Sequence, residues 1–214
     1  MHLKSTFKIL LILLLGFFTV LMINITIPYF AFDDKVAFLR IKQWIIHNEI
    51  WKGAFYTHVI TSCFCLIAGF TQFSGRLLSS TPKIHRAMGW LYVAVILLFA
   101  GPSGLIMSIY ANGGMFSQAA FITLSVLWIL FTYKGFKTAV MGDFSAHRKF
   151  MIRSYALTLS ALTLRAWKWA IVLAFRPQPM DVYMLVAWLG WVPNLLIAEW
   201  YIRSKFKHFK LTFK

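Results

Sequence analysis

The chain has 214 residues, of which 60% are hydrophobic and 13% are charged. An average soluble domain is about 25% charged, and a soluble fold of this length could not bury so much apolar surface. The net charge of +16 is high enough for nucleic-acid binding, but no soluble basic module lies outside the apolar runs. The composition therefore argues against nucleic-acid binding and indicates a multi-pass membrane protein.

Six apolar runs follow one another along the chain, and each has about the ~20 residues needed to cross ~30 Å of hydrocarbon. They lie near residues 7–30, 54–74, 86–110, 116–137, 149–175 and 182–203. The first run is longer than the apolar core of a typical signal peptide and lacks a convincing cleavage site, so we expect an uncleaved span. We predict an all-α, polytopic transmembrane bundle of six spanning helices, with residues 1–214 forming a single membrane domain.

The distribution of basic residues predicts the orientation of the bundle. With the N-terminus in the cytoplasm, 15 of the 22 Lys and Arg residues fall on the cytoplasmic side and five on the other side. Cytoplasmic loops are enriched in Lys and Arg, so we expect both termini in the cytoplasm and the protein in a bacterial inner membrane. The tail 203–214 alternates basic with aromatic residues, and we expect it to bind anionic lipid headgroups at the inner face.

The connection over residues 31–53 is the only long one, and it mixes apolar residues with charges. It fits an amphipathic helix lying on the outer membrane surface. An ordinary loop fits the same residues equally well, and both alternatives stay open.

Two His-Arg pairs stand where the third and fifth runs begin, as His85–Arg86 and His147–Arg148. Both runs start on the inner face, so the two histidines lie at similar depth. Two neutral imidazoles from facing helices can ligate a b-type haem, and the adjoining arginines suit its propionates. The alternative is interfacial anchoring, in which the pairs bind lipid phosphate or cap loops. An electron-transfer protein with His85 and His147 as axial ligands is therefore one hypothesis.

Arg165 lies in the fifth run, about ten residues from its outer end. That is roughly 15 Å deep, where an unpaired charge costs several kcal/mol. Pro102 in the third run frees the carbonyl of Leu98 at similar depth, which would offer Arg165 an acceptor. Two roles stay open for Arg165: a clasp on kinked helices, or a group that binds an anionic ligand.

Other polar residues lie near the level of Arg165. We predict a polar pocket in the outer half of the bundle, between the second, third, fifth and sixth runs. Its candidate ligand-binding residues are His58, Ser103, Arg165 and Asn194. No phosphate-binding glycine loop, metalloprotease motif, nucleophile elbow or cysteine cluster is present in the sequence, so we expect no catalytic residue and no metal site. The sequence also contains no feature that indicates an oligomeric state.

The stretch from Thr57 to Arg165 resembles a family of predicted bacterial membrane proteins known as a domain of unknown function, number twenty-three-oh-six. The resemblance rests on His58 and on the blocks AGFTQFSGRLLSSTPKIHRAMGWLY, GLIMSIYANGGMFSQAAF and MGDFSAHRKFMIRSYALTLSALTLR. Where the family often has Gly-Arg before the tyrosine of the third span, this chain has Gly89–Trp90. The resemblance implies the membrane architecture and no particular activity. We expect a ligand- or lipid-binding, transport or scaffold protein, with the haem protein as the alternative.

Overall fold

The computed structural model describes residues 2–72 and 75–206, and all the regular structure in these residues is helical. This confirms the predicted all-α class. The elements are α1 (His2–Thr26), η1 (Ile27–Ala31), η2 (Ala37–Lys42), α2 (Glu49–Gln72), α3 (Gly75–Ser80), α4 (Pro82–Ala94), η3 (Val95–Ala100), α5 (Gly101–Ile109), α6 (Gly114–Val140), α7 (Phe144–Thr158), α8 (Ser160–Phe175), α9 (Pro179–Leu189) and α10 (Val192–Phe206).

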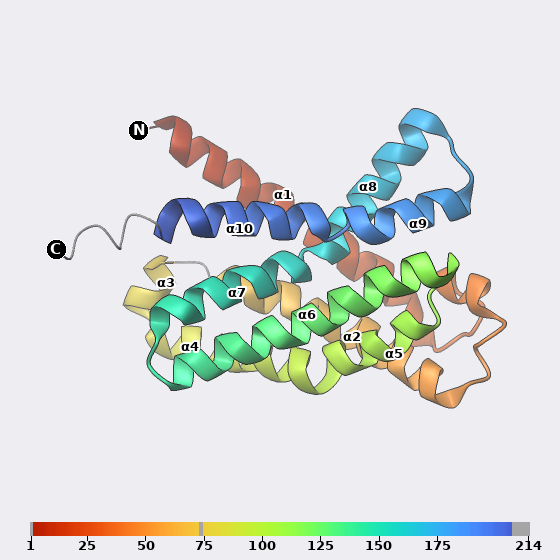
Figure 1. Ribbon diagram of the computed structural model, residues 1–214, viewed down its shortest axis with the longest axis horizontal. Helices are drawn as coiled ribbons and strands as arrows, with labels where there is room; N and C mark the ends of the chain where they lie inside the picture. Colours follow the sequence, from red (N-terminus) through yellow and green to blue (C-terminus); the bar gives the residue numbers. More distant parts are fainter. Residues whose placement is uncertain (1, 73–74, 207–214) are drawn as a thin grey trace.

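Six helical segments among the described residues are long and apolar enough to cross a membrane, which confirms the predicted number of spans. They are Leu13–Ala31, Glu49–Gly69, Pro82–Ile109, Gly114–Val140, Phe144–Phe175 and Pro179–Phe206. The helices lie side by side, and the start of α1 and the end of α10 are at the same end of the bundle, which is called the terminal end (Figure 1). The opposite end, which carries η1 and η2, is called the distal end.

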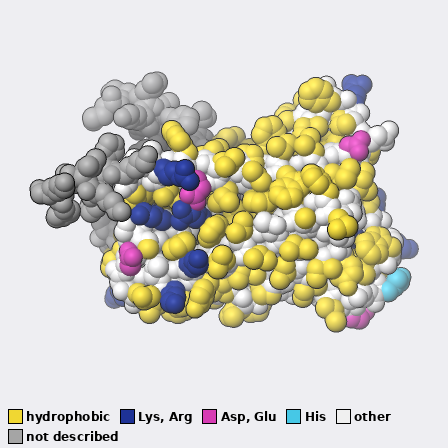
Figure 2. Space-filling view, in the orientation of Figure 1, with side chains coloured by type: hydrophobic (Ala, Val, Ile, Leu, Met, Phe, Trp, Pro, Cys, Tyr) yellow, Lys and Arg dark blue, Asp and Glu magenta, His cyan; other side chains and the backbone are white. Residues whose placement is uncertain are grey.

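The outer surface is apolar along most of its length. Large hydrophobic side chains such as Trp169, Trp200 and Phe175 are mostly exposed. In the face shown in Figure 2, hydrophobic side chains form a broad band, while charged side chains gather toward the two ends. A surface of this kind suits the hydrocarbon core of a bilayer between two polar interfaces.

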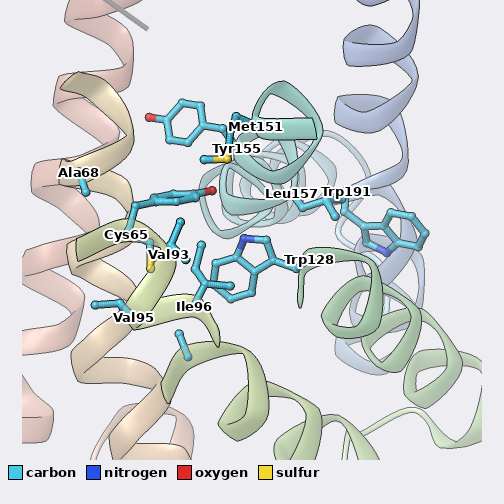
Figure 3. Close-up of a cluster of buried hydrophobic side chains, with 12 residues drawn as sticks. Cys65, Ala68, Val93, Val95, Ile96, Trp128, Met151, Tyr155, Leu157 and Trp191 are labelled. Atoms are coloured by element: carbon cyan, nitrogen blue, oxygen red, sulfur yellow. The ribbon is translucent and has the colours of Figure 1, made fainter. Parts of the chain in front are cut away.

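The core combines apolar packing with buried hydrogen bonds. Buried side chains from α2, α4, η3, α6, α7 and the break between α9 and α10 converge in the middle of the bundle (Figure 3). Within this core the Tyr92 hydroxyl lies 2.8 Å from Ser154 Oγ and 2.7 Å from Thr158 Oγ1. Trp128 Nε1 donates to the same Thr158 oxygen at 3.0 Å. Such interhelical hydrogen bonds help to fix helix packing where water is absent.

The segment between α1 and α2 folds over the distal end, and neither expectation for it describes it fully. It forms the short 3₁₀ helices η1 and η2 and a series of turns, not one amphipathic helix. Leu39 and Ile46 are buried against Trp51 and Phe55 of α2. The apolar residues of the segment thus pack onto the protein itself, because the first two turns of α2 present aromatic side chains to them.

Three of the spans are interrupted helices. The third contains a π-helical turn, η3, directly before Gly101 and Pro102, and the fifth breaks between α7 and α8. The sixth breaks at Gly190 and Trp191, two residues before Pro193. The prolines lack a backbone N–H, so each leaves carbonyls of the preceding turn without a helical donor. The tail 203–214, for which lipid binding is expected, lies beyond the described residues from position 207 onward.

Candidate functional site

A cavity of about 240 Å³ lies inside the distal half of the bundle. It extends from beneath η2 toward the middle of the core, and its wall is mostly apolar and aromatic. Polar side chains reach it from several elements, among them His58 and Ser62 on α2, Ser125 on α6, Thr158 on α7 and Arg165 on α8. None of the six Asp and Glu residues of the chain lines it, so the cavity is basic.

His58 enters the cavity wall at the π-helical turn of the third span. Its Nδ1 lies 2.8 Å from the carbonyl oxygen of Ala100, the last residue of that turn. A carbonyl only accepts, so Nδ1 carries the proton and Nε2 of the neutral ring is an acceptor. The ring lies against Gly104, where a Cβ atom would come within 2.9 Å of the imidazole. The π-helical turn supplies the carbonyl that accepts from His58, and the absence of a side chain at Gly104 leaves room for the imidazole ring.

Arg165 stands at the mouth of the cavity. It lines the cavity and also a shallow groove on the outer face of α8, and its side chain is exposed. Its Nη1 donates to Ala161 O at 2.7 Å, a carbonyl of its own helix rather than the carbonyl of Leu98. Arg165 forms no ion pair with any described residue. Most of the five N–H donors of this guanidinium, which lies inside a spanning segment, therefore have no acceptor among the described residues.

The other two residues expected in this pocket do not line the cavity. Ser103 Oγ donates to Phe99 O and Ala100 O within its own span. The Asn194 amide donates to Ala156 O at 3.2 Å and Thr163 Oγ1 at 3.0 Å, as well as to Gly190 O. Asn194 thus joins the broken ends of the fifth and sixth spans. The structural role considered for Arg165, which was to hold the interrupted helices together, is therefore filled by the Asn194 amide.

The cavity also recruits elements that the sequence analysis did not include. The fourth span contributes Phe121, Ser125 and Trp128, and the distal segment contributes Lys42 and Trp51. The indole Nε1 of Trp51 is buried and has no hydrogen-bond partner among the described residues. It is a second donor in the cavity wall that lacks an acceptor.

Lys42 is a deeply buried cation, with 2% of its surface exposed. It was not among the site residues predicted from the sequence. Its ammonium donates to Tyr110 O and, at 2.8 Å, to Asn112 Oδ1. The rings of Phe38, Trp44 and Trp51 lie 5.2 to 5.9 Å from it, within cation–π range.

Burial lowers the pKa of Lys42 to about 8, because an ammonium loses its hydration there. In the sequence it is one of several basic residues in a connection that mixes apolar residues with charges, and the neighbouring aromatic residues are the signal that could have indicated its burial.

The two predicted haem histidines lie toward the terminal end and do not line this cavity. His147 Nδ1 lies 2.8 Å from Gly135 O of α6, and His85 Nδ1 is buried without a partner among the described residues. Arg86 and Arg148 are exposed. No cluster of three or more His, Cys, Asp or Glu side chains suited to a metal ion occurs among the described residues.

One ion pair near the terminal end also went unrecognised in the sequence. Glu199 of α10 accepts from both Nε and Nη2 of Arg153 on α7, the latter at 3.0 Å. The guanidinium also lies over the rings of Phe131 and Phe150. This pair explains how an acidic side chain is accommodated in the sixth span, and it leaves Glu199 unavailable to Arg165.

The sequence profile of a family described as predicted membrane protein (DUF2306) matches residues 55–202, more than half of the chain. The chain belongs to the DUF2306 family. The match confirms the resemblance seen from residue 57 to residue 165 and extends it through the sixth span. All eight candidate residues lie within the DUF2306 segment, whereas Lys42 lies before it. Comparison with curated proteins and with solved structures produced no significant match.

Proposed function

We propose that this membrane protein binds an anionic ligand in the cavity lined by His58 and Arg165. The observation that carries the proposal is the position of Arg165, a cation in a spanning segment whose only described partner is a carbonyl of its own helix. Charged side chains at this depth are costly and usually mark functional sites. An anion in the cavity would give the guanidinium charge-assisted hydrogen bonds that the described residues do not supply.

The rest of the cavity wall favours the same ligand chemistry. Lys42 adds a second cation, and two of its three N–H groups have acceptors among the described residues. Trp51 adds an unpaired indole N–H. His58 Nε2 can accept a hydrogen bond from a hydroxyl or a protonated acid. The remaining wall is apolar, so the ligand combines a small acidic group with an apolar body.

The size of the cavity limits what fits inside it. Ligand pockets for drug-sized molecules are about 300–1,000 Å³, and this cavity of about 240 Å³ is smaller. A short-chain carboxylic acid such as hexanoate is a suitable probe, and hexanamide is a neutral probe of nearly the same shape.

Thermal unfolding of the purified protein in detergent tests the proposal. We expect the unfolding midpoint to rise with hexanoate concentration, because a ligand that binds only the folded state stabilises it. Hexanamide should leave the midpoint nearly unchanged. The proposal fails if the acid and the amide have equal effects, or if Arg165→Gln responds to hexanoate as the unmodified protein does. Arg176→Gln, at the end of the same helix, is the matched control.

A second candidate function is electron transfer through a b-type haem between His85 and His147. It is favoured by the contact of His147 Nδ1 with Gly135 O, since a metal-ligating histidine commonly donates its other ring N–H to a carbonyl. These residues would supply two axial nitrogen ligands, and the exposed Arg86 and Arg148 would be available to propionates. Absorption spectra of protein expressed with ample haem, oxidised and reduced, decide the matter: without a Soret band this candidate is excluded.

The orientation and location of the bundle belong to the proposal as well. We place both termini in the cytoplasm and the protein in a bacterial inner membrane, on the strength of the basic residues at the terminal end. Anionic headgroups of the inner leaflet would then be the partners of the basic C-terminal tail. In this orientation the cavity lies in the outer half of the membrane.

A further inference from the structure

The groove on α8 continues from the cavity at Arg165. It is lined by Arg165, Lys168, Trp169, Val172 and Leu173. These residues follow the spacing of one helix face, so the groove runs from Arg165 toward the distal end over about 12 Å. Arg165 lines both the groove and the cavity, so the groove and the cavity meet at its side chain.

The groove faces the surrounding membrane and is mainly apolar. Trp169 is 70% exposed and Leu173 is 67% exposed. Helix α8 tilts away from the axis of the bundle at the distal end (Figure 1). A hydrocarbon chain lying in this groove would contact the protein on one side and lipid on the other, without leaving an apolar environment.

The opening at Arg165 also determines which molecules can reach the cavity from this side. A free anion would have to cross hydrocarbon to arrive there, which is costly. An acid attached to a hydrocarbon chain is held in the membrane by its chain, and it can approach in its protonated, neutral form. On reaching the guanidinium it releases its proton, and the carboxylate then forms a charge-assisted pair with Arg165. Neutral His58 Nε2 is an acceptor available in the cavity for that proton.

We infer that the ligand is a single-chain acidic amphiphile that reaches the cavity from the membrane through the opening at Arg165. Its acidic head lies inside the cavity and its hydrocarbon chain lies in the groove on α8. This inference rests on the proposed function, because it names the class of the anion and the direction from which it arrives. Lys168 also lines the groove, and a lysine in a spanning helix can extend its amine toward the interface.

Quenching of tryptophan fluorescence by bromine locates the hydrocarbon chain directly. The protein is reconstituted in nanodiscs and titrated with stearate that carries bromine atoms at mid-chain. We expect quenching that saturates and is reversed by unbrominated stearate. The brominated methyl ester, which partitions into lipid but has no acidic head, should produce only a weak linear effect.

Two substitutions assign the saturable quenching to the groove and to the head site. Trp169→Phe should remove most of it, whereas Trp200→Phe, which removes an exposed tryptophan outside the groove, should preserve it. Arg165→Gln should abolish saturation while leaving the linear effect. Saturable quenching that persists in Trp169→Phe would place the chain elsewhere and overturn the inference.

The outcomes separate this inference from the function on which it rests. If hexanoate stabilises the protein in an Arg165-dependent manner but brominated stearate produces no saturable quenching, anion binding stands and access from the membrane is wrong. If neither probe binds, both proposals fail. If both bind and quenching depends on Trp169 and Arg165, both are supported.

Discussion

His58 on α2 and Arg165 on α8 line one cavity, although they lie on spans that are not consecutive. The imidazole is held by the carbonyl of Ala100 and the guanidinium by the carbonyl of Ala161. Each side chain therefore uses one backbone acceptor for orientation and keeps other polar atoms for the cavity. A ligand that approaches them meets Nε2 of His58 on one side and the N–H donors of Arg165 on the other.

Replacing Gly104 with alanine tests whether the position of His58 matters. The new Cβ atom would lie within 2.9 Å of the imidazole, so the ring must move and its hydrogen bond to Ala100 must weaken. We expect a lower unfolding midpoint and weaker hexanoate binding, although alanine is the better helix former by about 1 kcal/mol. Gly53→Ala on α2 is the control, because its Cβ would contact nothing within 4 Å. Equal behaviour of the two variants would contradict the role given to His58.

The pair Arg153–Glu199 is expected to stabilise the packing of α7 on α10. The carboxylate accepts two hydrogen bonds from the guanidinium, and both side chains are partly exposed, so the interaction is weaker than a fully buried pair. A double-mutant cycle with Arg153→Gln and Glu199→Gln should show a coupling energy of about 1 kcal/mol. Reversible unfolding in mixed detergent micelles measures it. Additive effects of the two substitutions would show that the pair contributes nothing.

Lys42 should make stability depend on pH in the alkaline range. Its pKa is about 8 in the folded protein and about 10.4 in an unfolded chain. Between these values the unfolded chain binds the proton that the folded protein has lost, so stability rises with pH. Below pH ~8 and above pH ~10.4 this contribution is constant.

The unfolding midpoint between pH 8 and pH 10 measures this effect by comparison with Lys42→Met, because other groups also titrate there. The rise should be smaller in the variant than in the unmodified protein. Identical pH profiles would show that Lys42 is hydrated rather than enclosed by the distal segment.

Reporter fusions test the orientation. A phosphatase joined to the C-terminus should be inactive in a bacterial host, and a cytoplasmic fluorescent reporter at the same position should be bright, since both termini are expected in the cytoplasm. An active phosphatase at the C-terminus would reverse the bundle and place the cavity in the inner half of the membrane.

The number and class of the helices could be predicted because a spanning helix is encoded locally, by about 20 consecutive apolar residues. Arg165 and His58 could be singled out because polar groups at membrane depth are costly wherever their neighbours lie. The partners of these residues could not be predicted. The partners depend on which helices pack against each other, and this is decided by contacts between segments that are distant in the sequence. The six apolar runs have similar compositions, so they do not indicate which of them are neighbours.

Two pairs of residues show what could not be predicted from the sequence: one pair was assigned to the pocket wrongly, and the other was missed. Ser103 and Asn194 have the right depth for the pocket but bond to backbone around the helix breaks, because a broken helix supplies acceptors locally. Lys42 and Ser125 line the cavity from a loop and from the fourth span. The loop was expected to lie on the membrane or in water, and the fourth span carries no charged residue before Lys134 that would have drawn attention to the region of Ser125.

The affinity for hexanoate across variants of Arg165 tests the central claim most directly. Equilibrium binding to the purified protein should weaken by at least about tenfold in Arg165→Lys, because the planar, multiply donating guanidinium is lost although the charge remains. Binding should be lost in Arg165→Gln, and Arg176→Gln should bind as the unmodified protein does. Equal dissociation constants for all four proteins would contradict the account, since the anion would then be bound without Arg165.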